Sequence, residues 1–232
     1  FLGSSANGIY SIAGKFSQLL TFAVTVFQLS WQENAILEKD NEGRDAFYTA
    51  TFNTYMKLLL GGYLIVLPVI KLLIPVLLDE SYQIGYLYNP ILLIGAIMSA
   101  FSQFYGSAYL VFKKTTGAFF TTVFAAVVNL AIGVGLINKI GLFAPALGTA
   151  LAFFTQWILR SIQMREYFKV NIDIKSFLFL CLCGVIVTYL YYINNVVIQI
   201  IAFILSTGIF IVINIQFIKS ILLNVVKKMK RS

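Results

Sequence analysis

Seven apolar runs, each long enough to cross a bilayer, follow one another along this sequence of 232 residues. A transmembrane helix needs about 20 predominantly apolar residues. Only 11% of the residues are charged and the mean hydropathy is +0.87, whereas an ordinary globular domain has roughly 25% charged residues. A soluble surface cannot be built from this composition. The sequence therefore predicts an all-α, polytopic transmembrane bundle of about seven helices.

Short polar or charged segments between the runs give the expected helix bounds. We predict helices over about 7–31, 56–78, 86–112, 116–137, 142–159, 176–193 and 196–218. Residues 1–160 are expected to form one domain of about five helices. Residues 161–232 are expected to add two more helices and a basic cytoplasmic tail that includes Lys227, Lys228, Lys230 and Arg231.

Basic residues are divided unevenly between alternate connections of the predicted helices. Short loops rich in Lys and Arg stay on the cytoplasmic side of a membrane. One set of connections and ends holds fourteen basic residues, and the other holds only Lys139. The fourteen are Lys39, Arg44, Lys57, Lys113, Lys114, Arg160, Arg165, Lys169, Lys175, Lys219, Lys227, Lys228, Lys230 and Arg231. This partition predicts that residue 1 is outside and that the C-terminus is cytoplasmic. The net charge of +8 does not form one patch with aromatic residues, so a nucleic-acid partner is not expected.

The first predicted helix carries a polar stripe along an otherwise apolar helix. At 100° per residue the stripe falls within an arc of roughly 140°. Its members are Asn7, Ser11, Lys15, Gln18, Thr21, Thr25, Gln28 and Gln32. Lipid would penalise such a stripe, so we expect it to face other helices or a water-filled cavity. Ser11, Thr21 and Thr25 would also serve helix packing.

Lys15 is the strongest candidate for a functional residue in this stripe. It lies about eight residues, or ~12 Å at 1.5 Å per residue, inside the predicted outer boundary. One interpretation is a lysine that extends its ammonium to the interface, and the other is a cation that faces a cavity. Lys71, near the outer end of its helix, fits the first interpretation better.

Two later helices each contain one polar residue that stands out from a line of small residues. Gln103 lies near Gly95, Ser99 and Gly106, and Asn129 lies in a similar line in the next helix. Small residues let helices approach closely, and a polar side chain among them often bonds across the interface. Packing and cavity lining remain alternatives for both residues.

The sequence lacks the residues that several kinds of chemistry require. Histidine is absent, and the two cysteines, Cys181 and Cys183, lie two apart inside an apolar run, so we expect neither a metal site nor a disulfide. The GxxxxGK[ST] phosphate loop does not occur, and paired carboxylates are absent from every predicted span. The chain is therefore expected to be a protein without enzymatic activity or a cofactor.

The first predicted helix also contains a recognisable series of residues. Gly8, Tyr10, Ser11, Ala13 and Lys15 open it, and Phe27, Gln28 and Trp31 close it. In this order and spacing, the chain resembles the bacterial polysaccharide flippases of the O-antigen (Wzx-type) family. Further matches, over roughly residues 3–160, are Tyr82, Pro90, Phe104-Tyr105-Gly106, Lys114-Thr115 and Asn129. The segment Gly141 to Ala150 is also similar, although Ala144-Pro145-Ala146 stands where Gly-Ala-Ala is more usual.

The resemblance implies a two-lobed, MATE-like transporter fold of which this chain is the C-terminal part. Residues 1–160 would form most of the C-terminal lobe, and the N-terminal half of the same protein would be a partner preceding residue 1. The substrate would be a lipid-linked oligosaccharide on undecaprenyl diphosphate, moved across the inner (cytoplasmic) membrane by alternating access.

Together, the polar stripe and the family motif give a set of expected cavity residues. The set is Asn7, Tyr10, Ser11, Lys15, Gln18, Gln28, Gln103 and Asn129. Because a buried diphosphate needs a cationic partner, Lys15 is the expected contact to it. Two alternatives remain: a multidrug or toxin extruder of the same superfamily, which would favour acidic cavity residues, and a membrane-embedded glycosyl- or acyltransferase of the same pathway.

Overall fold

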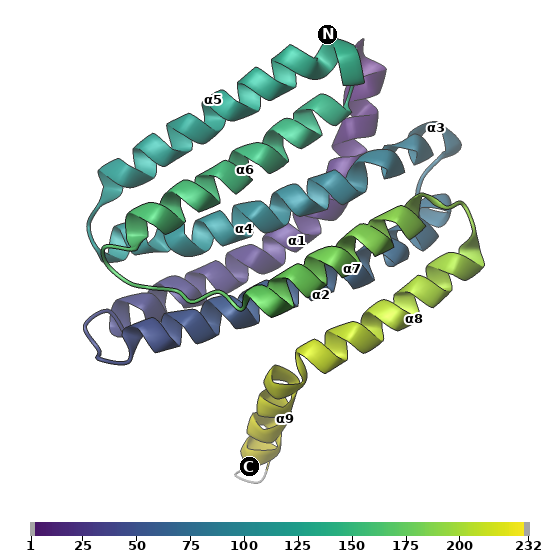
Figure 1. Cartoon of the computed structure of the whole chain (residues 1–232). Helices are drawn as coiled ribbons and strands as arrows, with labels where there is room; N and C mark the ends of the chain where they lie inside the picture. The colour runs from purple at the N-terminus through teal and green to yellow at the C-terminus, as the bar shows by residue number, and fades with distance from the viewer. Residues whose placement is uncertain (1–2, 230–232) are drawn as a thin grey trace. The chain divides into compact units, whose positions relative to one another are not determined.

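A computed structural model describes residues 3–229, and Figure 1 shows that its elements are helices. The predicted tail residues Lys230 and Arg231, and the predicted external Phe1, lie outside the described residues. Within residues 3–229, 88% of the chain is helical and no strand occurs. The elements are α1 (Gly3–Leu37), α2 (Arg44–Leu77), α3 (Glu80–Gln83), the 3-10 helix η1 (Ile84–Tyr88), α4 (Asn89–Val111), α5 (Thr115–Ile140), α6 (Phe143–Met164), α7 (Ile174–Tyr192), α8 (Val196–Ile213) and α9 (Ile215–Met229).

Six helical segments of the described chain are long and apolar enough to cross a membrane. They are α1, α2, the segment Glu80–Val111 that ends with α4, α5, α7 and α8. The 22-residue helix α6 is not among them, and it carries the polar residues Gln156 and Arg160. The structure confirms an all-α, multi-pass membrane bundle, with six candidate spans where the sequence predicts about seven.

Some predicted boundaries differ from the observed ones. The sequence predicts a first helix that ends near residue 31 and a second that begins near residue 56, but α1 continues to Leu37 and α2 already begins at Arg44. Tyr48, Phe52 and Tyr55 recur at helical spacing and are buried, which explains why α2 starts before its apolar run. The last predicted helix, 196–218, is broken at Asn214 into α8 and α9.

The chain divides into two compact units, which are described separately. Unit 1 comprises Phe1–Thr49 and Leu73–Asn171, and unit 2 comprises Ala50–Leu72 and Ile172–Ser232. The middle of α2 therefore belongs to unit 2 and its two ends to unit 1. This division concerns compactness, and the predicted assignment of residues 1–160 to one transporter lobe stays a prediction.

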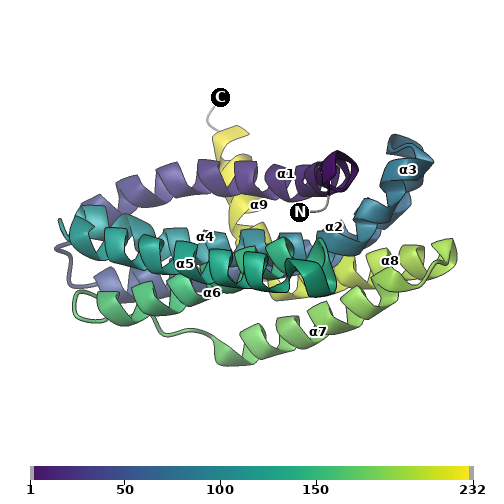
Figure 2. The same cartoon turned by 90° about the horizontal axis from the view of Figure 1, so that it is seen from above.

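Helix α4 provides the core of unit 1. It begins with Pro90 in its first turn, where proline is tolerated, and buries Leu93, Ile97, Phe101 and Phe104. Helices α1 and α6 both pack against α4, and α6 also packs against α5. Figures 1 and 2 show α6 running beside both of these neighbours.

Close packing of α5 on α6 depends on a small residue. A Cβ atom at Gly148 would lie 3.0 Å from the backbone oxygen of Asn129 and 3.3 Å from the backbone nitrogen of Gly133. Helix α5 ends at Ile140, and the φ of 57° at the following Gly141 lies in the left-handed region that glycine adopts without strain. The next helix begins two residues later and returns along α5.

Polar contacts join α2 to α7 within unit 2. The hydroxyls of Tyr63 and Thr188 are 2.6 Å apart. Asp173 caps α7 by accepting a hydrogen bond from the Ser176 backbone at 3.1 Å, and it forms an ion pair with Lys57 at 2.8 Å. Hydrogen bonds from Lys57 and then Ser176 lower the pKa of Asp173 to about 2. The start of α7 is thereby fixed to α2 by a charged group.

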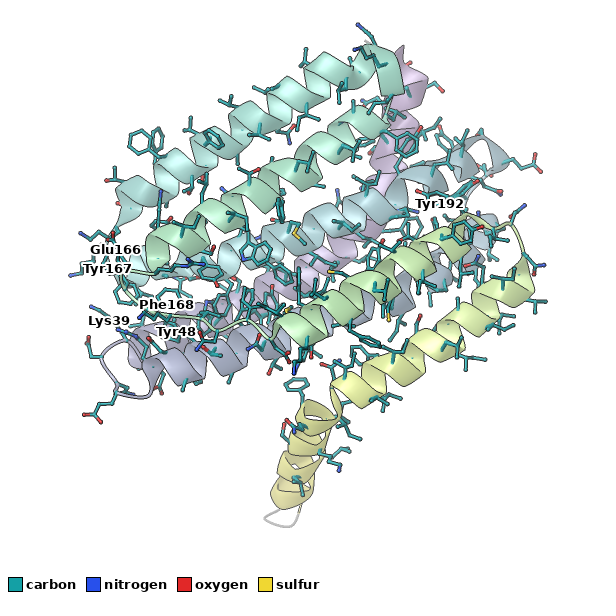
Figure 3. All side chains as sticks on the ribbon, in the orientation of Figure 1. Lys39, Tyr48, Glu166, Tyr167, Phe168 and Tyr192 are labelled. Carbon is teal, nitrogen blue, oxygen red and sulfur yellow. The ribbon has the colours of Figure 1, made fainter. Side chains whose placement is uncertain are left out.

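One end of unit 1 combines basic and aromatic side chains. The ammonium of Lys39 lies 5.9 Å from the ring centre of Phe112, and that of Lys114 lies 5.8 Å from the ring centre of Tyr167. Figure 3 shows Lys39, Tyr167 and Phe168 at this end. Lys139 lies in the last turn of α5, whose first turn adjoins the basic end. The predicted basic connections of unit 1 therefore meet at one end, where aromatic residues are typical of a membrane interface.

Candidate functional site: the polar face of α1

Helix α1 buries one side and leaves the side with the predicted polar stripe uncovered. Its buried residues are Ala13, Val24, Trp31 and Ala35. In the helical register these four lie within a narrow arc next to the polar stripe, and α1 packs against α4. The rest of the surface of α1 is largely available to lipid or to other protein, since only 11% of the residues in its most apolar 18-residue segment are buried.

Four predicted cavity residues form the exposed polar face of α1, which we define as Asn7, Ser11, Lys15 and Gln18. Among residues 3–229, none of these four side chains makes a hydrogen bond or an ion pair. A lysine at the centre of a membrane helix costs roughly 2.5–3.5 kcal/mol when only lipid surrounds it. The polar face of α1 is thus a surface that requires water, a polar ligand or further protein.

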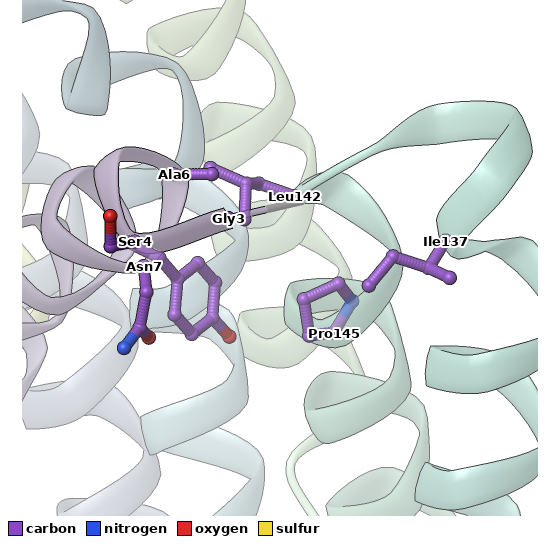
Figure 4. Close-up of a pocket in the computed structure, with 8 residues that line it drawn as sticks. Gly3, Ser4, Ala6, Asn7, Ile137, Leu142 and Pro145 are labelled. Atoms are coloured by element: carbon purple, nitrogen blue, oxygen red, sulfur yellow. The ribbon is translucent and has the colours of Figure 1, made fainter. Parts of the chain in front are cut away.

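A pocket lies at the amino-terminal end of this polar face. Its volume is about 560 Å³, and Figure 4 shows Asn7 on one side of the pocket and Pro145 and Ile137 on the other. Tyr10, another predicted cavity residue, also lines it. The pocket joins α1 to the ends of α5 and α6, all within unit 1. It offers an amide and a phenol beside apolar walls, which suits a neutral, hydroxylated ligand.

Gln28 and Gln103 meet each other, in the contact between α1 and α4. The Gln28 amide donates to the backbone oxygen of Gln103 at 2.8 Å and also to the hydroxyl of Ser107. One turn later, the Trp31 indole donates to the backbone oxygen of Phe104 at 3.0 Å, and the two rings stack with centres 4.0 Å apart. We call this contact the α1–α4 joint. It consists of Gln28 and Trp31 of α1 with Gln103, Phe104 and Ser107 of α4.

Asn129 takes the packing role that was one alternative for it. Its amide donates to the hydroxyl of Thr149 at 3.1 Å, from α5 to α6. Of the eight predicted cavity residues, six lie on α1, where Asn7 and Tyr10 reach the pocket, and two lie on other helices. The structure gives Gln28, Gln103 and Asn129 contacts between helices, and their predicted place in a cavity stays a prediction.

A buried arginine was not identified as a site by sequence reasoning. Arg160 is 9% exposed, although the sequence places it at a helix end among the cytoplasmic bases. Its guanidinium donates to the Thr121 hydroxyl at 3.2 Å, the Ser102 carbonyl at 3.1 Å and the Thr122 hydroxyl at 3.1 Å. Its acceptors belong to α4 and α5, so Arg160 holds three helices together. The sequence signal that could have indicated a buried Arg160 was Gln156, which lies one turn earlier on the same face of α6.

Each of the three guanidinium nitrogens of Arg160 has a protein partner. Gln156 accepts from the Ser102 hydroxyl at 2.8 Å and donates to Thr122 at 3.1 Å. The ring of Tyr109 lies 5.8 Å from the guanidinium carbon. Every donor direction of Arg160 described here ends on another helix, so this cluster is suited to holding helices together rather than to binding a ligand.

The polar face of α1 adjoins the pocket that Asn7 and Tyr10 line. No group of three His, Cys, Asp or Glu residues that could hold a metal occurs among residues 3–229. No family model, no curated protein and no solved structure matches the chain.

Proposed function

We propose that this chain is part of a flippase that moves a polyprenyl-diphosphate-linked oligosaccharide across the cytoplasmic membrane by alternating access. The observation that carries the proposal is Lys15, an exposed cation without a partner among the described residues, on a helix of a multi-pass bundle. A diphosphate that crosses a medium of low dielectric constant needs such a cation, because an unpaired charge there costs several kcal/mol.

The neighbours of Lys15 support a substrate that also carries sugars. Ser11 and Gln18 flank it on the same face and supply a hydroxyl and an amide for hydroxyl groups. Asn7 continues the face into the pocket. No Asp or Glu occurs on α1 before Glu33, which favours an anionic substrate over the cationic substrates of a multidrug extruder.

The proposal requires a second wall for the cavity. A polar helix face in a membrane protein lies against protein or water rather than lipid. We assign this wall to another helical lobe of the same protein, in keeping with the two-lobed plan that the resemblance implies. The diphosphate would pair with Lys15 while the sugars occupy the adjoining polar surface.

The experiment replaces Lys15 in the complete protein that carries residues 1–232 and measures export of the lipid-linked oligosaccharide in cells without another flippase. A hydrogen bond to a charged group contributes about 1.5–3 kcal/mol, and every 1.4 kcal/mol is tenfold. Lys15→Ala should therefore lower the export rate by about tenfold to a hundredfold at equal membrane abundance. Lys15→Arg keeps the charge and should retain appreciable export.

Lys71 is the matched control, since it is a lysine in a different candidate span. It lies 5.6 Å from the ring centre of Tyr191 in unit 2. Lys71→Ala should leave export within a few-fold of wild type, because a lysine near the interface is replaced at small cost. Normal export by well-expressed Lys15→Ala would show that Lys15 is only an interfacial anchor, and the proposal would fail.

A further inference from the structure

Helix α9 has a different character from the spans that precede it. It has 15 residues and begins immediately after Asn214, at a sharp bend from α8 that Figure 1 shows. In its helical register, the apolar residues Ile215, Ile218 and Leu222 recur on one side. The opposite side holds Gln216 and Ser220, with Leu223 next to Gln216. This pattern is typical of a helix that lies between an apolar and an aqueous phase.

The bend before α9 is fixed by packing. Asn214 is 3% exposed, and its amide donates to the backbone oxygen of Phe210 at 3.0 Å. A Cβ atom at Gly61 of α2 would lie 2.8 Å from the Phe210 ring and 3.5 Å from the Asn214 amide nitrogen. The close approach of α2 therefore holds the junction in place within unit 2.

The length of α8 places this junction at a membrane boundary. Its 18 residues extend about 27 Å at 1.5 Å per residue, close to the roughly 30 Å of a hydrocarbon core. The chain that follows Asn214 thus leaves the hydrocarbon at the point where α9 begins. Ile215 is 43% exposed and Leu222 is 59% exposed, so the described protein does not cover this apolar side.

The charge of this part of the chain is of one sign. After Asp173 the sequence contains no acidic residue, whereas Lys219, Lys227, Lys228, Lys230 and Arg231 fall within α9 and the residues that follow it. Anionic lipid head groups attract such residues, and each one near the surface contributes about fivefold to binding. A basic amphipathic helix lies in the plane of the interface, with its apolar side among the acyl chains.

We propose that α9 is an interfacial helix that binds the anionic lipid surface of the membrane that α8 crosses. Its apolar side enters the boundary of the acyl chains and its lysines contact lipid phosphates. The covalent connection to a membrane-spanning helix keeps α9 beside this surface, which favours lipid over a soluble partner. The inference rests on α8, α9 and the junction between them, and it is independent of the proposed substrate.

The test uses spin labels on the full chain in bilayer nanodiscs. The labels are placed at Leu222→Cys, on the apolar side, or at Ser220→Cys, on the polar side, in a Cys181→Ala, Cys183→Ala background. In discs of phosphatidylcholine with phosphatidylglycerol, the label at position 222 should be several-fold more accessible to oxygen than to a water-soluble nickel complex. The label at position 220 should show the reverse preference, and salt should weaken the contrast because it screens charge.

Charge variants test the lipid preference. Lys227→Gln with Lys228→Gln should lower the lipid-bound population in phosphatidylglycerol discs by up to about 25-fold, at fivefold per residue. Lys139→Gln, in α5, should leave it unchanged. High nickel accessibility at both labels would show that α9 stands in water, and protection of both labels from both reagents would show that protein covers it. Equal membrane contact without phosphatidylglycerol would refute the anionic preference.

Discussion

Gly106 of α4 lies against the guanidinium that joins three helices. A Cβ atom at this position would be 2.6 Å from Nη1 of Arg160 and 3.5 Å from its Cζ. Ordinary contact begins near 3.4 Å, so Gly106→Ala has to displace Nη1 by almost an ångström. Nη1 donates to the Ser102 carbonyl at 3.1 Å, and a displacement of that size disrupts this bond and strains the other two that Arg160 makes.

The expected decrease in the free energy of unfolding follows from those hydrogen bonds. Hydrogen bonds between membrane helices contribute about 0.6 kcal/mol on average and about 1.7 kcal/mol at most. Losing one to three of them predicts that Gly106→Ala lowers the free energy of unfolding by about 1–3 kcal/mol. Gly135→Ala in α5 is the control, because a Cβ atom there meets nothing within 4 Å, and it measures the intrinsic effect of the added methyl group.

A double-mutant cycle isolates the contact itself. Glutamine ends near the position of Nε, so Arg160→Gln removes the atoms that the new methyl group would meet. In that background Gly106→Ala should lower the free energy of unfolding by less than about 0.5 kcal/mol, which corresponds to a coupling free energy of about 0.5–3 kcal/mol. Unfolding by increasing SDS in mixed micelles, followed by Trp31 and Trp157 fluorescence, gives each value. An equal cost of Gly106→Ala in both backgrounds would refute the reasoning.

Three further predictions follow from the fold. Gly148→Ala should lower the free energy of unfolding in the same micelles by about 1–3 kcal/mol, because the added Cβ would lie 3.0 Å from the backbone oxygen of Asn129. A variant as stable as wild type would mean that α5 and α6 separate freely. The pKa of the Asp173 carboxyl is lowered from 3.8 to about 2, chiefly by Lys57. The carboxylate should therefore stabilise the chain fully above pH 3.8, and this contribution should be lost as the pH falls through 2. When unfolding is measured against pH, the Asp173→Asn variant should not show this loss of stability in acid. A reporter active only outside the cell should be active when inserted after Asn195 and silent when fused to the last residue, whereas the opposite result would invert the predicted topology.

The sequence was sufficient for features that depend on local composition. Apolar runs predicted the membrane helices, and the turn at Asn195 was placed correctly because that residue caps α8 by accepting from the Val197 backbone at 2.9 Å. The basic connections of unit 1 meet at one end, away from Lys139, as the alternation of charged connections indicated. Predicting these features requires only the transfer free energy of each segment from water to lipid and the chemistry of helix ends.

Other features depend on residues far apart in the sequence. Arg160 was grouped with loop bases because a hydropathy pattern gives its cost in lipid but not its acceptors, which lie 38 to 58 residues away. The break at Asn214 was missed because the apolar run continues through it, and its cause lies in the close approach of Gly61. The sequence places Gln28 and Lys15 in one polar stripe of α1, but only the contacts with α4 separate Gln28, which bonds to that helix, from the exposed Lys15.

The joint between α1 and α4 places different demands on its two sides. Gln28 and Trp31 contribute side-chain donors, whereas Gln103 and Phe104 contribute backbone oxygens. Every amino acid carries a backbone oxygen, so a change at position 103 leaves the acceptor for Gln28 in place. Among sequences related to this chain, positions 28 and 31 should consequently stay nearly invariant while position 103 diversifies. The side chain at position 103 can then change without loosening the contact between the two helices.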